Sequence, residues 1–157
     1  MKRNVSFEVS SRGTLWWFIL CILFIYLVDL LTVHPNVTSG GGNLGLLFVI
    51  PAIVVFLLFA KSLWKTLGRI DLKLSTRKKL GWGALVLLLL FCYLEYRFTI
   101  GVIRDLGGSP EVVSSRIYRY SWLNQYTNTI FINYYTFSIL VTIIGIAQAL
   151  LRKGRQD

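Results

Sequence analysis

Two carboxylates, Asp29 and Glu95, stand inside long apolar runs of the sequence. Ionisable side chains within a membrane span are costly, so they are the first candidates for chemistry. Each lies about fifteen residues into its run, and at about 1.5 Å per helical residue both would reach about 22 Å from the start of the span. At one depth, two carboxylates could form an acid–base site. The structural alternative is a carboxylate near a helix end that is paired with Arg97 or hydrated at the interface.

Further polar residues fall near the same depth. His34 lies just beyond Asp29, and Asn133 and Thr136 stand at the start of the last apolar run. Polar groups from several runs at one depth predict a site near one membrane interface. The residues that we expect to face inward there are Asp29, Glu95, Tyr96, Arg97, Asn133 and Thr136.

Four apolar runs must position these residues. Each is close to the ~20 residues that a helix needs to cross a hydrocarbon core. Hydrophobic residues make up 55% of the 157-residue chain, which is more than a soluble domain of this size could bury. Pro51 lies within the second run and should kink it. The sequence predicts one all-α membrane domain, residues 1–157, with four transmembrane helices over about 14–33, 44–63, 80–98 and 130–151.

Lys and Arg are unevenly distributed between the two sides of these spans. Three lie in the N-terminal tail, seven in residues 61–79 and three in the C-terminal tail, against four in the loop 99–129 and its approach. The positive-inside rule therefore predicts both termini on the cytoplasmic side of a cell (inner or plasma) membrane. The net charge of +10 then reflects topology, and we expect no nucleic-acid partner.

The outer side is predicted to carry a small loop domain over residues 99–129. A loop this long in a small protein is usually functional or disordered. Residues 112–121 alternate weakly between apolar and polar side chains, so we expect a short strand or an interfacial helix there.

No pattern in the sequence predicts a cofactor or a metal. Cys21 and Cys92 both lie in apolar runs and are expected to be buried apolar residues. A metal site would need more ligands than these thiols and His34. Small residues recur along the last run and predict close helix packing. They are Ser138, Thr142, Gly145 and Ala149.

Short motifs in the order of the chain resemble a known family. Residues 29–32 (Asp-Leu-Leu-Thr) close the first run, and residues 43–48 (Asn-Leu-Gly-Leu-Leu-Phe) open the second. Arg97 precedes Gly101 and Asp105, and Asn133 precedes Ile139. With four spans, the chain resembles the lipoprotein signal peptidases (signal peptidase II), bacterial membrane proteins with an aspartate dyad near the outer interface. The resemblance implies that the site is lined by Asn43, Gly45, Arg97, Gly101, Asp105 and Asn133.

Both catalytic positions of that family carry other residues here. Counted from Arg97 and Asn133, the aspartates are replaced by Tyr96 and Thr136. Tyrosine is un-ionised near neutral pH and threonine supplies no acid or base, so neither replaces a carboxylate. Glu95 is adjacent to Tyr96 but about 100° around a helix from it, so we expect it to point elsewhere. The resemblance therefore implies a degenerate member that lacks peptidase activity.

Three functions remain open on the sequence. The first is a non-catalytic relative that binds a lipoprotein, a lipid or a partner helix at the outer leaflet. The second is an active aspartic-type endopeptidase whose altered dyad is Asp29 and Glu95. The third is an accessory or immunity-type subunit of a larger membrane complex, in which the basic cytoplasmic loop binds anionic lipid or the partner protein.

Overall fold

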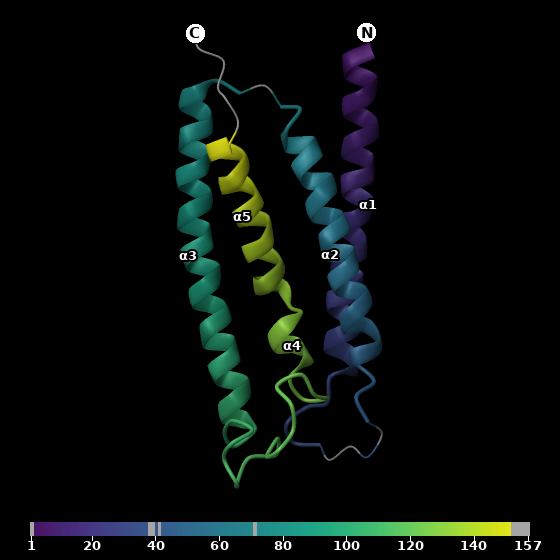
Figure 1. Cartoon of the computed structure of the whole chain (residues 1–157), viewed down its shortest axis with the longest axis vertical. Helices are drawn as coiled ribbons and strands as arrows, with labels where there is room; N and C mark the ends of the chain where they lie inside the picture. Colours follow the sequence, from purple (N-terminus) through teal and green to yellow (C-terminus); the bar gives the residue numbers. More distant parts are fainter. Residues whose placement is uncertain (1, 38–39, 41, 71, 152–157) are drawn as a thin grey trace.

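The computed structural model describes residues 2–37, 40, 42–70 and 72–151. The elements within these residues are all helical, and no strand forms among them. They are α1 (Lys2–Leu31), α2 (Leu46–Leu67), α3 (Leu74–Asp105), α4 (Asn128–Phe131) and α5 (Tyr134–Leu151) (Figure 1).

Four stretches of the described chain are long and apolar enough to cross a membrane. They are Ser11–Leu31, Leu46–Leu67, Leu74–Asp105 and Asn128–Leu151. Many of their large apolar side chains are exposed, for example Leu57, Leu89 and Leu150. Such a surface suits lipid rather than water. The prediction of an all-α fold is thus confirmed, and its four expected spans correspond to four stretches that are long and apolar enough to cross a membrane.

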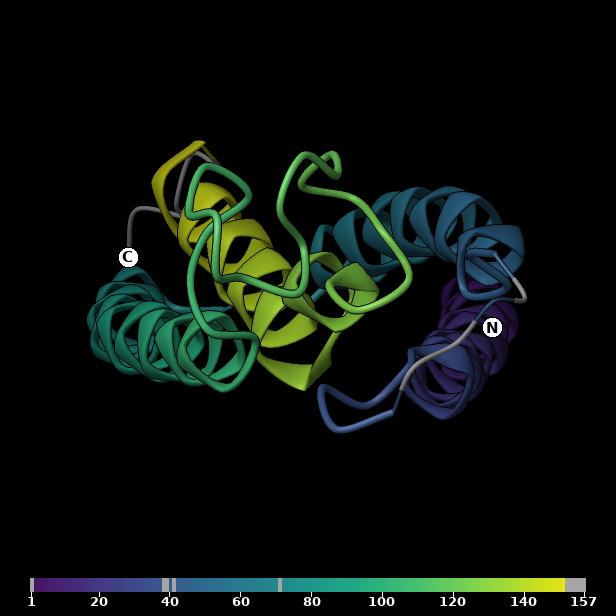
Figure 2. The same cartoon turned by 90° about the horizontal axis from the view of Figure 1, so that it is seen from below.

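The helices form two pairs. α1 packs along α2, α3 packs along α5, and contact between α2 and α5 joins the pairs. α1 and α3 lie on opposite sides of the bundle in both views (Figures 1 and 2). We call the end where α1 and α3 begin the basic end, because residues 61–79 with seven Lys and Arg lie there. The opposite end, which carries residues 32–37, 42–45 and 106–127, is the loop end.

Aromatic side chains link the two pairs. Phe137 of α5 lies between Phe56 and Phe59 of α2, with ring centroids 5.2 Å from each. All three are buried in the main apolar core, as is Cys21 of α1. Cys92, in contrast, is exposed on α3, so the expectation of two buried cysteines is wrong for that residue.

The helix bounds differ from the predicted spans in two ways. α3 begins six residues before and ends seven residues after the predicted span of 80–98, because helical hydrogen bonding continues beyond the lipid-crossing part that hydropathy detects. The last span is broken at Ile132, whose φ of −125° and ψ of 97° are extended, so that α4 and α5 are separate helices. α2 continues through Pro51 as one helix.

Residues 106–127 fold through turns, so the expected strand or interfacial helix over 112–121 is wrong. Ser115 Oγ donates to the Gly108 carbonyl at 2.6 Å and accepts from the Ile117 amide at 3.2 Å. Such local side-chain bonds compete with a strand ladder. Ile117 is buried in a small apolar cluster with Leu106 and Tyr126 (Figure 2 shows this end).

Candidate functional site

Glu95 of α3 contacts Asn133, the residue directly before α5, where these two helices pack together. Glu95 Oε2 accepts a hydrogen bond from Asn133 Nδ2 at 2.8 Å, and Oε1 accepts from Thr99 Oγ1 at 3.2 Å. Asn133 is buried and Glu95 is half-buried. We call Glu95, Asn133 and Thr136 the Glu95–Asn133 cluster.

The break between α4 and α5 explains why Asn133 is there. Its Oδ1 accepts from the backbone amides of Tyr135 at 2.7 Å and Thr136 at 2.9 Å, which caps α5. Thr136 Oγ1 in turn accepts from the Asn133 amide at 3.1 Å, as in a capping box. Asn133 Nδ2 also donates to the Thr129 carbonyl at 2.8 Å. Both hydrogens of Nδ2 are therefore used, and the side chain holds the Glu95 carboxylate in place.

Tyr96 and Arg97 lie outside this cluster, so the expectation that they face inward is wrong. Tyr96 is 62% exposed. Arg97 is exposed as well, and its Nη1 donates to the Tyr93 hydroxyl at 3.1 Å. Glu95 faces α5, as predicted for the inward-facing residues, although the resemblance had assigned that face to Tyr96. α3 has no buried residue that would mark its packed face, and its polar contact with α5 is the hydrogen bond between Glu95 and Asn133.

The structure does not bring Asp29 to Glu95. Asp29 is exposed near the end of α1, and α1 and α3 occupy opposite sides of the bundle (Figure 2). The predicted inward position of Asp29 is therefore wrong.

Two motif residues at the end of α3 also lie apart from the cluster. A Cβ built on Gly101 would meet no heavy atom within 4 Å. No neighbouring element therefore packs closely against this glycine. Asp105 is exposed and lies 3.7 Å from Arg104 Nε, a surface ion pair of little energetic weight. Asp105 also borders an open cavity of about 600 Å³ together with His34 and Asn36.

A second polar contact involves the Asn43-x-Gly45 motif. Asn43 and Asn128 exchange two amide hydrogen bonds, of 2.6 Å and 3.2 Å. Asn43 Oδ1 also accepts from the Leu46 amide at 3.2 Å, at the start of α2. A Cβ on Gly45 would lie 2.3 Å from Asn128 Nδ2, so glycine is required there. We call Asn43 and Asn128 the amide pair.

Sequence reasoning missed Asn128, which is fully buried. The available signal was the unbroken polar run 124–129 directly before the last span, since polar side chains at that depth need partners. Asn128 begins α4 and Asn133 follows its end, so this short helix carries both polar contacts.

The chemistry open to these residues is limited. The Glu95–Asn133 cluster contains a single carboxylate, whereas aspartic-type hydrolysis needs two that share a proton. In the described ranges, His, Cys, Asp and Glu side chains form no group of three that could hold a metal ion. The cluster can accept hydrogen bonds or hold a cationic group.

Comparisons with protein-family models, curated proteins and solved structures find no match to this chain. The described chain has four helical stretches long and apolar enough to cross a membrane and two amide-based contacts toward its loop end.

Proposed function

We propose that this chain is a non-catalytic relative of the lipoprotein signal peptidases. It crosses the cell membrane four times with both termini in the cytoplasm, and at the outer leaflet it binds a lipoprotein, a lipid or a partner helix. The observation that carries the proposal is the Glu95–Asn133 cluster, which joins polar side chains between α3 and the start of α5 but has one carboxylate.

The positions of the motif residues support this proposal. Asn43 and Gly45 contact Asn128, and Asn133 contacts Glu95, so these motif positions hold the loop end together. A scaffold retained without its catalytic pair is what a binding relative would need. Thr136 is engaged in capping α5, which leaves it no role in proton transfer.

The proposed orientation can be tested by labelling. In a Cys92→Ser background, Ser121→Cys should react with a membrane-impermeant maleimide in intact cells, because residue 121 is exposed at the loop end. Ser75→Cys, exposed at the basic end, should react only after the cells are opened. The reverse pattern would place the termini outside.

The proposed binding is tested with purified protein in detergent and a diacylglyceryl-modified lipoprotein precursor. An authentic lipoprotein signal peptidase serves as the positive control for release of the signal peptide, which is followed by gel shift. We expect retention of the precursor without cleavage. Glu95→Ala should weaken retention, whereas Cys92→Ala, an exposed position on the same helix, should not.

Other outcomes would replace the proposal. Release of the signal peptide that Glu95→Ala abolishes would establish an active endopeptidase with an altered catalytic pair. If the precursor is neither retained nor cleaved and the chain purifies with a stoichiometric partner, it is an accessory or immunity-type subunit.

A further inference from the structure

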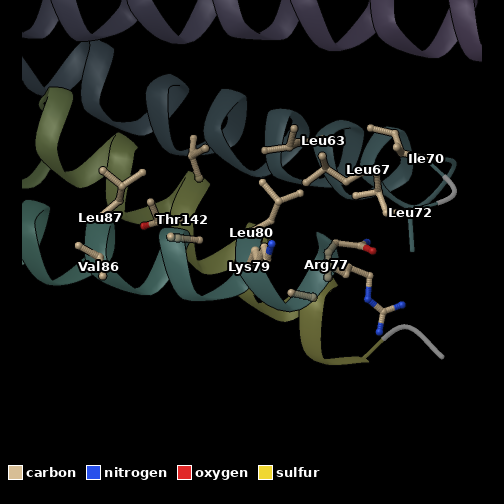
Figure 3. A pocket seen from close by; sticks show the side chains of 16 residues that line it. Leu63, Leu67, Ile70, Leu72, Arg77, Lys79, Leu80, Val86, Leu87 and Thr142 are labelled. Atoms are coloured by element: carbon tan, nitrogen blue, oxygen red, sulfur yellow. The ribbon is translucent and has the colours of Figure 1, made fainter. Parts of the chain in front are cut away.

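A groove lies at the basic end, between the two helix pairs. Its volume is about 770 Å³, within the ~300–1,000 Å³ of small-molecule pockets. Figure 3 shows Leu63 and Leu67 of α2 facing Leu80 of α3 across it. This groove is at the opposite end of the bundle from the Glu95–Asn133 cluster, and the inference drawn from it does not rest on the proposed function.

Small residues between α3 and α5 explain the groove. A Cβ on Gly81 would lie 3.0 Å from the Ala149 Cβ, and one on Gly145 would lie 3.7 Å from the Ala84 Cβ. These contacts bring α3 close to α5 and leave α2 further away at this end. Gly83 lines the groove, and a Cβ built on it meets no atom within 4 Å.

The basic rim of the groove distinguishes it from an ordinary lipid-facing surface. Arg77 and Lys79 line it near Ile70 and Leu72 (Figure 3). The Nε atom of Arg77 is buried and has no hydrogen-bond partner among the described residues. A buried charged donor without an acceptor is costly, so the half-buried guanidinium of Arg77, which lines the groove, would be stabilised by an anionic group in it.

We propose that this groove binds an anionic phospholipid from the leaflet at the basic end. One acyl chain lies along Leu63, Leu67 and Leu80, and the phosphate lies beside Arg77 and Lys79. The surrounding charge suits this ligand, because residues 61–79 contain seven basic residues and one acidic residue. Basic pockets between transmembrane helices are typical sites for anionic headgroups.

The size of the groove suits one acyl chain better than a partner helix. A helix about 10 Å wide that rises about 1.5 Å per residue fills about 120 Å³ per residue. The groove would therefore hold about six helical residues, far fewer than the ~20 of a span. Its apolar walls also offer few partners to the backbone of an extended peptide.

The proposal is tested by native mass spectrometry of the full chain in a non-ionic detergent. The protein is titrated separately with phosphatidylglycerol and phosphatidylcholine. We expect one phosphatidylglycerol to bind about tenfold more tightly than phosphatidylcholine. Both lipids carry a phosphate, but the choline ammonium of phosphatidylcholine is repelled by the basic residues around the groove.

Two variant pairs separate a site from general attraction to a basic surface. Arg77→Gln should weaken phosphatidylglycerol binding roughly tenfold. Lys78→Gln should weaken it less, because it removes the same charge from an exposed residue that does not line the groove. Gly83→Leu should fill the groove and reduce phosphatidylglycerol binding. Gly13→Leu should leave binding unchanged, because it places the same side chain in open space on α1. Far-UV circular dichroism verifies that each variant is folded.

Equal affinity for the two lipids would overturn the proposal. So would Arg77→Gln and Lys78→Gln variants that weaken binding to the same extent. If Gly83→Leu is folded and binds phosphatidylglycerol as Gly13→Leu does, the acyl chain does not occupy the groove.

Discussion

Replacing Gly45 by alanine tests how strongly the amide pair fastens the start of α2. Gly45 has a φ of −60° and a ψ of −28°, which alanine adopts freely, so backbone strain plays no part. The added Cβ would lie 2.3 Å from Asn128 Nδ2 and 3.2 Å from Asn128 Cγ. Because Asn128 is fully buried, it cannot move aside without losing its bonds to Asn43.

The magnitude follows from those bonds. Each side-chain hydrogen bond contributes about 0.5–1.5 kcal/mol, and an amide left buried without a partner costs about 1–3 kcal/mol. We expect Gly45→Ala to lower the free energy of unfolding by about 2–4 kcal/mol. The measurement is unfolding by sodium dodecyl sulfate in mixed micelles, followed by far-UV circular dichroism.

Gly101→Ala is the matched control, because Gly101 also belongs to a motif but has open space around its Cβ. Inside a helix, alanine should raise the free energy of unfolding by about 0.5–1 kcal/mol relative to glycine. The two substitutions are therefore expected to have opposite signs. If Gly45→Ala is as stable as the parent, the amide pair does not fasten α2 to α4 and the reasoning is refuted.

Three further substitutions test the remaining contacts by the same unfolding measurement. Asn133→Ala should lower the free energy of unfolding by about 2–4 kcal/mol, because it removes the cap of α5 and a charge-assisted hydrogen bond to Glu95. A decrease below about 1 kcal/mol would contradict this. Gly81→Leu should lower the free energy of unfolding by about 1–3 kcal/mol, because even its Cβ would lie 3.0 Å from the Ala149 Cβ; unchanged stability would mean that α3 and α5 separate freely. Arg97→Ala should change stability by less than about 0.5 kcal/mol, because Arg97 is exposed; a larger loss would indicate an inward contact.

Hydropathy predicted the positions of the four spans because each is a continuous apolar run near the ~20 residues of a bilayer crossing. It could not predict the break before Asn133, where the side chain caps a new helix inside a run that is apolar on average. The signal for it was the Asn-x-x-Thr spacing of Asn133 and Thr136, which suits an N-cap.

The rotation of α3 could not be predicted either. In a soluble helix an apolar stripe indicates the inward face, but α3 has no buried residue along its 32 positions. A face toward lipid would be as apolar as a face toward another helix, so hydropathy does not mark the inward side. Glu95 faces inward because Asn133 offers it a donor, and that contact depends on a helix about forty residues further along the chain.

The two ends of the bundle are held by different forces. In lipid, apolar helices gain little by packing together, because acyl chains are as apolar as leucine side chains. Polar contacts and close packing therefore decide how the helices are arranged. The amide pair at the loop end and the aromatic contacts of Phe137 near the middle of α2 join the helix pairs. At the basic end, Gln148 Nε2 donates to the Trp64 carbonyl at 3.0 Å, and the groove opens beside this contact. An acyl chain can fill that space without the loss of any polar contact, so the bundle need not close at the basic end.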